Sequence, residues 1–233
     1  MPLHRSSLAL QHIALLAGLS SERLDQLAQQ CRWQNIPAGK PLLLRSEQKS
    51  DVYFLVSGQL RVTIYAANGR QVTFRDSVEG DYFGDLAAID GQPRSADVVT
   101  LRPSVVAILD RAAFLALLRD EPLVAERVMR SLAALVRQLS ERVIDLSTLG
   151  VQNRVHAELL RMARAAGIVD NRARLDPAPT HAELASRIST NREQVTRELN
   201  ALARGGLLVK DGKALVVADV QRLEHMVAEV RGA

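Results

Sequence analysis

The pattern of apolar and polar positions is strand-like through the first half of the chain. Between residues 36 and 109, short apolar runs such as VYFLV, LRVTIY and SVVAIL are separated by glycine-containing turns. Turns at about ten-residue spacing predict an antiparallel sandwich or roll. We take the fold to be a β-roll of the jelly-roll type. Asn68-Gly69, between two of the runs, is the sharpest hairpin signal. Before the roll, ERLDQLAQQC follows Ser20 and predicts a capped helix.

From about residue 111 to 149 the pattern becomes helical. Pro122 suits a first helical turn, and apolar residues then recur at steps of three and four. These residues are Val128, Leu132, Leu135, Leu139, Val143 and Leu146. The spacing is close to the seven-residue repeat of coiled coils. A helix lying on its own domain is one interpretation. We favour a dimerisation helix, because the stripe continues for about five turns.

In the last third, two short helices and a tight turn are predicted. A first helix is expected over residues 152–166, and Gly167 can end it. Thr180 and Glu183 then have the spacing of a capping box, and Asn191 can cap the helix that follows. Two helices joined in this way predict a helix-turn-helix.

A hairpin and a final helix complete the pattern. LLVKDGKALVV predicts two strands around Asp211-Gly212, and Asp219 can cap the last amphipathic segment. The fold class is therefore α+β. Its parts are expected to be a β-roll sensor domain over residues 1–110, a dimerisation helix and hinge over 111–149, and a winged helix-turn-helix over 150–233.

One face of the second short helix carries side chains suited to DNA bases. Its inward stripe is Val195, Leu199 and Leu202, which leaves four side chains outward near its start: Arg192, Glu193, Thr196 and Arg197. This half of the second helix enters the major groove in helix-turn-helix proteins. Arginine can donate two parallel hydrogen bonds to guanine, and glutamate can accept from cytosine.

Other polar residues nearby suit the phosphate backbone. Candidates for phosphate contacts are Thr180, Asn191, Gln194, Lys210 and Lys213. The alternative for the outward face is a solvated surface with ion pairs such as Glu193–Arg197. The hairpin that follows, which has the place of a wing, favours DNA binding.

Composition excludes several classes of protein. The chain has 233 residues, 47% hydrophobic and 24% charged, which excludes a disordered chain. No apolar run reaches membrane-spanning length and no signal peptide is evident, so we expect a cytoplasmic protein without a membrane partner. Cys31 is the single cysteine, which excludes an intrachain disulfide and a cysteine-rich metal or iron–sulfur site.

Catalysis is not predicted. The sequence shows neither Ser-His-Asp nor metal-ligand spacing, so no enzyme and no metal are expected. His156, His181 and His225 fall in predicted helices and are expected to be ordinary surface or boundary residues.

Charge and aromatic placement favour a duplex partner for the last third. From residue 149 onward, 13 Lys and Arg stand against 10 Asp and Glu. This excess is a weak indication of a polyanion. All eight aromatic residues lie between Trp33 and Phe114, so the C-terminal part has no base-stacking platform for single strands.

The stretch FGDLAAIDGQPRSA places Arg94 behind a proline, among small residues and soon after Gly84-Asp85. Such an arginine is either a surface charge or a two-pronged donor for an anion. This stretch and NREQVTR together resemble motifs of the CRP/FNR family of bacterial transcription regulators. That family's roll carries F-G-E-aliphatic-A…P-R-[AS]-A, and the DNA helix of its cyclic-AMP-responsive members carries S-R-E-T-V-x-R. The resemblance covers nearly the whole chain, in the same order.

The resemblance implies a cyclic-nucleotide site in the roll. Gly84 would allow close backbone approach, Arg94 would pair with the cyclic phosphate, and Asp85 would accept from the ribose 2′-hydroxyl. The turn formed with Leu86, and the nest formed by Ser95 and Ala96, would complete the site. The alternative is an empty roll in which Arg94 pairs with a protein carboxylate such as Asp85.

The chain departs from the family pattern at several positions. Asp85 is one methylene shorter than the family's glutamate. Leu139-Ser140 stands where cyclic-AMP-responsive relatives have Thr-Ser, and Leu139 cannot hydrogen-bond an adenine. Asp97 is a candidate acceptor for the N–H groups of guanine, which would favour cyclic GMP, or else a strand-surface acid. Ser189 stands where the turn commonly has glycine, which is tolerable if its φ stays negative.

The expected function is ligand-gated regulation of transcription. A homodimer would bind palindromic double-stranded operator DNA, with cyclic AMP or cyclic GMP as effector and RNA polymerase as a further partner. One alternative is the same architecture with a different signal, namely a cyclic dinucleotide, redox state or a gas sensed through haem, or with no small ligand. The others are an enzyme and a nucleotide-binding module that regulates a partner protein.

Overall fold

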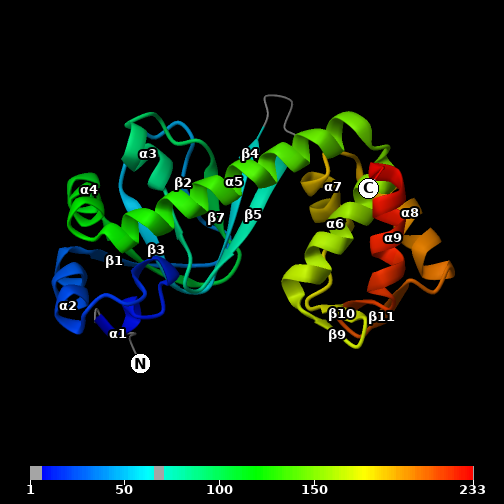
Figure 1. Cartoon of the computed structure of the whole chain (residues 1–233), viewed down its shortest axis with the longest axis horizontal. Coiled ribbons are helices and arrows are strands. Elements are labelled where there is room, and N and C mark those ends of the chain that lie inside the picture. Colours follow the sequence, from blue (N-terminus) through cyan, green and yellow to red (C-terminus); the bar gives the residue numbers. More distant parts are fainter. Residues whose placement is uncertain (1–6, 66–70, 233) are drawn as a thin grey trace. The chain divides into compact units, whose positions relative to one another are not determined.

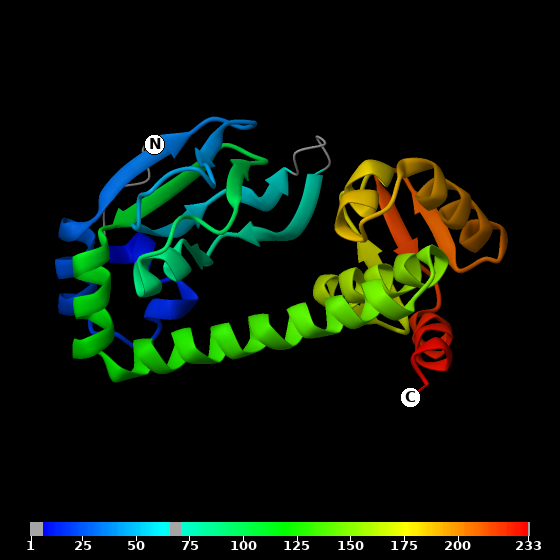
Figure 2. The same ribbon diagram turned by 90° about the horizontal axis from the view of Figure 1, so that it is seen from above.

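The chain forms two compact units, Met1–Leu135 and Val136–Ala233, in a computed structural model that describes residues 7–65 and 71–232. The predicted turn at Asn68-Gly69 lies outside the described residues. Helix α5 (Pro122–Thr148) is unbroken and belongs to both units (Figures 1 and 2). The two units thus meet inside the predicted dimerisation helix, and the division at residues 110 and 149 stays a prediction.

The first unit is a roll of two four-stranded antiparallel sheets, as the spacing of turns predicts (Figure 1). One sheet has the order β1-β8-β3-β6 (Arg32–Ile36, Ser104–Leu109, Val52–Ser57, Tyr82–Phe83). The other has the order β2-β7-β4-β5 (Pro41–Leu43, Asp97–Thr100, Gln59–Tyr65, Gln71–Val78).

Strand β3 explains why VYFLV is apolar throughout. Tyr53 and Leu55 belong to the buried cluster that also contains residues of the second sheet, such as Leu60 and Val98. Val52, Phe54 and Val56 belong to a different cluster, shared with the helices of the unit. Alternate side chains of a strand point to opposite faces, so a strand buried on both faces has no polar positions.

Helices form that second cluster with the first sheet. They are α1 (Ser7–Leu10), the short 3-10 turn η1 (Ala14–Leu16), α2 (Ser21–Gln30), α4 (Arg111–Asp120) and the start of α5. The Ser20 hydroxyl caps α2 by accepting from the backbone N–H of Arg23 at 3.2 Å, as predicted. Helix α3 (Asp85–Asp90) lies in the stretch that contains Arg94.

The second unit is a winged helix-turn-helix. Its helices after α5 are α6 (Val151–Ala166), α7 (His181–Arg187), α8 (Arg192–Arg204) and α9 (Val220–Arg231). Its sheet has the order β11-β12-β10-β9 (Leu208–Asp211, Ala214–Val217, Arg172–Leu175, Ile168–Val169). The hairpin at Gly212 and the helix capped by Asp219 match the prediction, whereas β9 and β10 were not foreseen.

Within the described ranges, no helix has the length and apolar character needed to cross a membrane.

Candidate functional site

The predicted anion-binding stretch begins at a left-handed glycine. Strand β6 ends at Phe83, and Gly84 precedes α3 with φ +87°. A Cβ on Gly84 would lie 2.7 Å from Nη1 of Arg94 and 2.8 Å from the carbonyl oxygen of Asp51. Both the backbone angle and the lack of space require glycine. The structure therefore brings Gly84 and Arg94 together, and the role of Gly84 in the approach of a ligand stays a prediction.

Arg94 is buried, with 3% of its surface exposed. Its Nη1 donates to the carbonyl of Gly84 at 3.0 Å, and its Nη2 donates to the carbonyl of Asp51 at 2.8 Å. The guanidinium carbon lies 5.6 Å from the ring centroid of Tyr53, a cation–π contact. These partners are backbone carbonyls and a ring. These contacts give no support to the alternative in which the Asp85 carboxylate holds Arg94.

One of the three guanidinium nitrogens of Arg94 has no hydrogen-bond partner among the described residues. This nitrogen, Nε, is buried. Burial lowers the pKa of Arg94, while the Tyr53 and Asp51 charges oppose this shift. A guanidinium keeps its proton under ordinary conditions, so Nε is a buried N–H group that lacks an acceptor. An anion could supply that acceptor.

Asp85 is the first residue of α3 and is partly buried. Burial raises the pKa of its carboxyl, and hydrogen bonds from its own backbone N–H and the charge of Arg75 oppose the shift. Leu86 follows it in α3 with an exposed side chain, Ser95 is exposed, and Ala96 is buried. The carboxyl and the Ser95 hydroxyl are thus polar groups on the same stretch as Arg94.

Two predicted ligand contacts have other partners here. Asp97 begins β7, and its Oδ1 accepts from the backbone N–H of Arg45 at 2.8 Å. A contact between Asp97 and guanine would therefore compete with this bond. Ser140 donates its hydroxyl to the carbonyl of Val136 at 2.9 Å, and Leu139 is 38% exposed. Both belong to the second unit, and their contact with a ligand in the roll stays a prediction.

Side-chain caps fix where the two helices of the helix-turn-helix begin. The Thr180 hydroxyl accepts from the N–H of Glu183 at 3.2 Å, and the Glu183 carboxylate accepts from the N–H of Thr180 at 2.7 Å. This is the predicted capping box. The Asn191 side chain caps α8 by accepting from the N–H of Gln194 at 2.9 Å.

Helix α8 presents the predicted faces. Val195, Leu199 and Leu202 are buried in the core of the second unit. The exposed side chains near its start are Arg192, Glu193, Gln194 and Arg197. The N-terminal half of α8 thus offers two guanidiniums and a carboxylate on one surface.

The other residues predicted to contact DNA differ in whether their side chains already have hydrogen-bond partners within the protein. The Thr196 hydroxyl lies 2.6 Å from Nδ1 of His181 and 2.9 Å from the carbonyl of Arg192. The Thr190 hydroxyl donates to the side-chain amide oxygen Oε1 of Gln194. Lys210 and Lys213 are exposed on the hairpin β11–β12, as a wing requires.

The condition under which serine is easily tolerated at position 189 is not met. The φ of Ser189 is +55°, in the left-handed region, and not negative. Ser189 follows Ile188, which ends α7, and the N–H of Thr190 turns back to the carbonyl of Ala185 at 3.0 Å. A helix that ends in this way needs one left-handed residue, for which glycine is favoured.

The expectation for His156 is wrong, because this side chain belongs to the core. His156 is 2% exposed, and its Nε2 lies 2.6 Å from Oε1 of Glu198. The contact joins α6 to α8. A signal was present in the sequence, since Glu198 is three residues after Val195 and so lies beside the inward stripe. His181 is partly buried and His225 is exposed.

Comparison with known proteins agrees with this geometry. The family model described as "Cyclic nucleotide-binding domain" matches residues 33–121, and "Crp-like helix-turn-helix domain" matches residues 153–226. The chain is 30% identical over 217 residues to the cyclic AMP receptor protein of Thermus thermophilus, which covers 91% of this chain and 95% of that protein. The chain belongs to the CRP/FNR family. Its members are regulators of transcription rather than enzymes, and they bind DNA as dimers.

Two further proteins are similar over most of the chain. The CRP-like cAMP-activated global transcriptional regulator of Mycobacterium tuberculosis is 26% identical over 215 residues, 92% of this chain and 96% of that protein. The solved structure of a CooA mutant from Carboxydothermus hydrogenoformans has a TM-score of 0.75 at 20% identity and covers 85% of this chain and 88% of that one. The second likeness concerns the fold alone.

The roll of this chain contains two donors of a kind that can bind a small anion. The orphaned N–H of Arg94 and the exposed hydroxyl of Ser95 are donors of the type that a phosphate requires. Asp51 and Tyr53 contact Arg94 but were not predicted to do so from the sequence. The run VYFLV, which contains Tyr53 and directly follows Asp51, indicates only a buried strand. In the part of the chain that the structure describes, no group of three His, Cys, Asp or Glu side chains is placed to hold a metal ion.

Proposed function

We propose that this protein is a homodimeric, ligand-gated regulator that binds palindromic operator DNA under the control of a cyclic nucleotide, cyclic AMP or cyclic GMP. The proposal of a nucleotide ligand rests on the buried N–H of Arg94, which lacks an acceptor and lies inside the domain that matches the cyclic-nucleotide-binding model. The names of the relatives from T. thermophilus and M. tuberculosis favour cyclic AMP.

In the effector site, Arg94 would bind the cyclic phosphate and Asp85 would accept from the ribose. Gly84, Leu86, Ser95 and Ala96 would shape the backbone around the phosphate. Leu139 and Ser140 would approach the base from the dimer helix, and Asp97 would reach guanine only by giving up its bond to Arg45. Because Leu139 cannot hydrogen-bond, it would offer the base a purely apolar contact.

In the DNA-reading unit, Arg192, Glu193, Thr196 and Arg197 would face the bases. Phosphate contacts would come from Thr180, Asn191, Gln194, Lys210 and Lys213. Dimerisation through residues 122–146 is supported by apolar side chains exposed along α5, such as Val136 and Val143. Two-fold symmetry would set the two copies of α8 about 34–36 Å apart. The protein would act in the cytoplasm, beside RNA polymerase.

The test is a titration of purified dimer with each cyclic nucleotide, followed by calorimetry and by operator binding. The operator is first selected from random duplexes. Arg94→Ala should abolish nucleotide binding and leave thermal unfolding cooperative, whereas Arg119→Ala, at an exposed arginine of α4, should change neither. Arg192→Ala and Arg197→Ala should abolish operator preference and leave the dimer intact. An Arg94→Ala variant that still responds normally to nucleotide would refute the effector site.

A second candidate is the same DNA-binding architecture with another signal or none. Three observations favour it: both Nη atoms of Arg94 already have partners, Asp85 is short, and Leu139 is apolar. The same titration with a cyclic dinucleotide, and an absorbance spectrum for haem, distinguish it from the first. Operator binding that no nucleotide changes would favour this candidate.

A further inference from the structure

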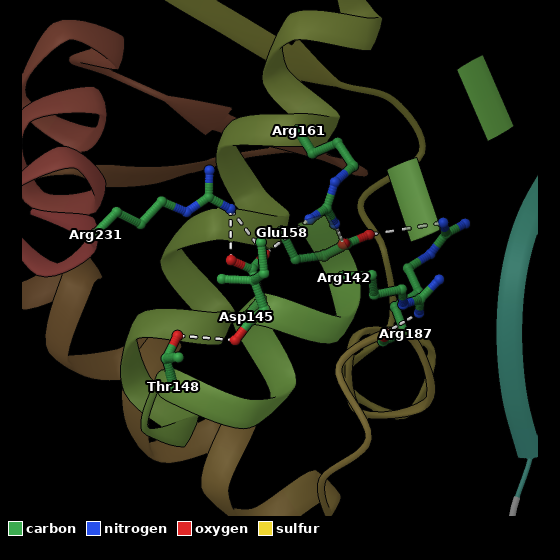
Figure 3. Close-up of polar contacts among 8 residues, drawn as sticks. Arg142, Asp145, Thr148, Glu158, Arg161, Arg187 and Arg231 are labelled. Carbon is green, nitrogen blue, oxygen red and sulfur yellow. Dashed lines mark hydrogen bonds and ion pairs between the residues drawn. The ribbon is translucent and has the colours of Figure 1, made fainter. Parts of the chain in front are cut away.

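Two buried carboxylates in the second unit are surrounded by arginines (Figure 3). Asp145 and Glu158 are 5% and 4% exposed. Nη2 of Arg231 donates to both oxygens of Asp145, at 2.6 and 2.8 Å. Arg161 donates to Asp145 at 3.4 Å and also to Glu158. Arg187 lies 3.7 Å from Glu158. Carboxylates this deeply buried are stable only when they are paired.

These residues join four helices. Asp145 and Arg142 come from the end of α5, Arg187 ends α7, Arg231 ends α9, and α6 supplies the other two members. Arg142 also donates to the backbone carbonyl of Arg187. Since α7 is the first helix of the helix-turn-helix, the last turns of α5 are fixed to the element that leads into α8. We name the six residues the Asp145 cluster: Arg142, Asp145, Glu158, Arg161, Arg187 and Arg231.

Arginines outnumber carboxylates among the six residues of the Asp145 cluster, and Glu141 is a further carboxylate whose charge acts on Arg161. Four guanidiniums face two carboxylates. Burial lowers the pKa of Arg161, Asp145 opposes that shift, and Arg142 and Arg231 add to it. The arginines therefore repel one another, and the two carboxylates hold them together. Neutralising one carboxylate would leave four cations and a single anion among these six residues.

We propose that Asp145 is a positioning residue for DNA recognition, which fixes the end of α5 to the helix-turn-helix through Arg231 and Arg161. The cluster thereby sets the orientation in which α8 is presented to the operator. This inference rests on the proposed function, because it concerns how the same DNA-reading face is held. It assigns a role to residues that no sequence motif marks.

The first experiment measures orientation without DNA or nucleotide. Spin labels are attached at Arg137→Cys on α5 and Ala203→Cys on α8, both exposed positions, in dimers diluted with unlabelled chains. The native Cys31 is buried and its pKa is raised to about 12, so the labels go to the introduced thiols. Asp145→Asn should broaden the distance distribution. A distribution identical to that of the unsubstituted protein would overturn the proposal.

A matched control exists between α6 and α9, two of the four helices that the Asp145 cluster joins. Arg164 of α6 pairs with Glu224 of α9 at 2.9 Å, with side chains 61% and 40% exposed. Exposed ion pairs contribute little to stability or geometry. Glu224→Gln should therefore keep the narrow distribution. If it broadens the distribution as much as Asp145→Asn does, the effect is not specific to the Asp145 cluster and the proposal fails.

The second experiment measures recognition. Asp145→Asn should weaken operator binding by about tenfold, a usual size for coupling between sites, and leave binding to random duplex unchanged. Arg231→Gln should act in the same direction, and it serves as the test if Asp145→Asn does not fold. The double variant Asp145→Asn/Arg231→Gln restores a neutral hydrogen-bonding pair and should recover operator affinity. Unchanged operator affinity in both single variants would overturn the proposal. If the unsubstituted protein binds no operator at all, the proposed function fails, and the label distances still decide the positioning role.

Discussion

Nη1 of Arg94 lies 3.0 Å from the carbonyl oxygen of Gly84 and only 2.7 Å from the position that a Cβ at residue 84 would take. The arginine and the glycine therefore depend on one another. The presence of Arg94 near the end of the stretch FGDLAAIDGQPRSA requires a residue without a side chain near its start.

Gly84→Ala should destabilise the roll more than an ordinary left-handed glycine does. Alanine in the left-handed region costs about 1–2 kcal/mol, and displacing a packed guanidinium adds about 1–3 kcal/mol. Gly39 has φ +72° with nothing within 4 Å of its Cβ position, so Gly39→Ala should show only the first cost. Urea unfolding of both variants measures the difference. Equal losses would show that Arg94 does not crowd Gly84.

Ser189→Gly should stabilise the helix-turn-helix. The φ of +55° at Ser189 is unfavourable for serine and free for glycine, so the free energy of unfolding should rise by about 1 kcal/mol. Ser189→Ala keeps the unfavourable angle and should bring no gain. Thermal unfolding of the two variants is the measurement, and a similar gain from both would contradict the role given to the backbone angle.

His156 and Glu198 should be energetically coupled. Their atoms are 2.6 Å apart and nearly buried, so replacing either one by alanine leaves a polar partner without its bond. A double-mutant cycle on the free energy of unfolding should give a coupling of about 1–3 kcal/mol. The exposed pair His225–Glu229, at 3.1 Å with side chains 76% and 64% exposed, is the control and should give at most about 0.5 kcal/mol. A coupling free energy for His156 and Glu198 no larger than that of the control pair would show that their contact does not stabilise the packing of α6 on α8.

Cys31 should resist alkylation in the folded protein. Burial, with a smaller effect from the charge of Asp110, raises the pKa of its thiol from 9.0 to about 12. At pH 8 the folded chain then holds about a thousandfold less thiolate than the unfolded chain. Because the folded-state pKa is the higher one, the free energy of unfolding should fall as the pH rises above about 9. Iodoacetamide labelling with and without denaturant tests the first point, and fast labelling of the folded chain would contradict it.

The features that the sequence predicts well are local. Thr180 with Glu183, Asn191 with Gln194 and Asp219 with Arg222 are caps that span three residues, and all are present. The apolar stripe of α8 is equally local, because it depends only on the helical period.

The features that the sequence does not predict depend on distant pairs. Arg94 and Asp51 are 43 positions apart, and His156 and Glu198 are 42 apart, so no periodicity links them. Strands β9 and β10 are short and mostly exposed, and only pairing with β12 identifies them as a sheet. The angle at Ser189 breaks a residue preference, which local reasoning cannot foresee.

The contacts of Thr196 limit which bases this side chain could recognise in the proposed complex with operator DNA. Its hydroxyl donates its hydrogen within the protein, either to the carbonyl of Arg192 or to Nδ1 of His181. A hydroxyl has only one hydrogen, so Thr196 retains a lone pair and a methyl group. It can meet the methyl of thymine or the amino group of adenine or cytosine, but it has nothing to offer the acceptor edge of guanine. With α8 in a major groove, Thr196 could therefore not hydrogen-bond the major-groove edge of guanine. Replacing thymine by uracil in the half-site removes the thymine methyl group, and a loss of affinity would show that the methyl group of Thr196 contacts it.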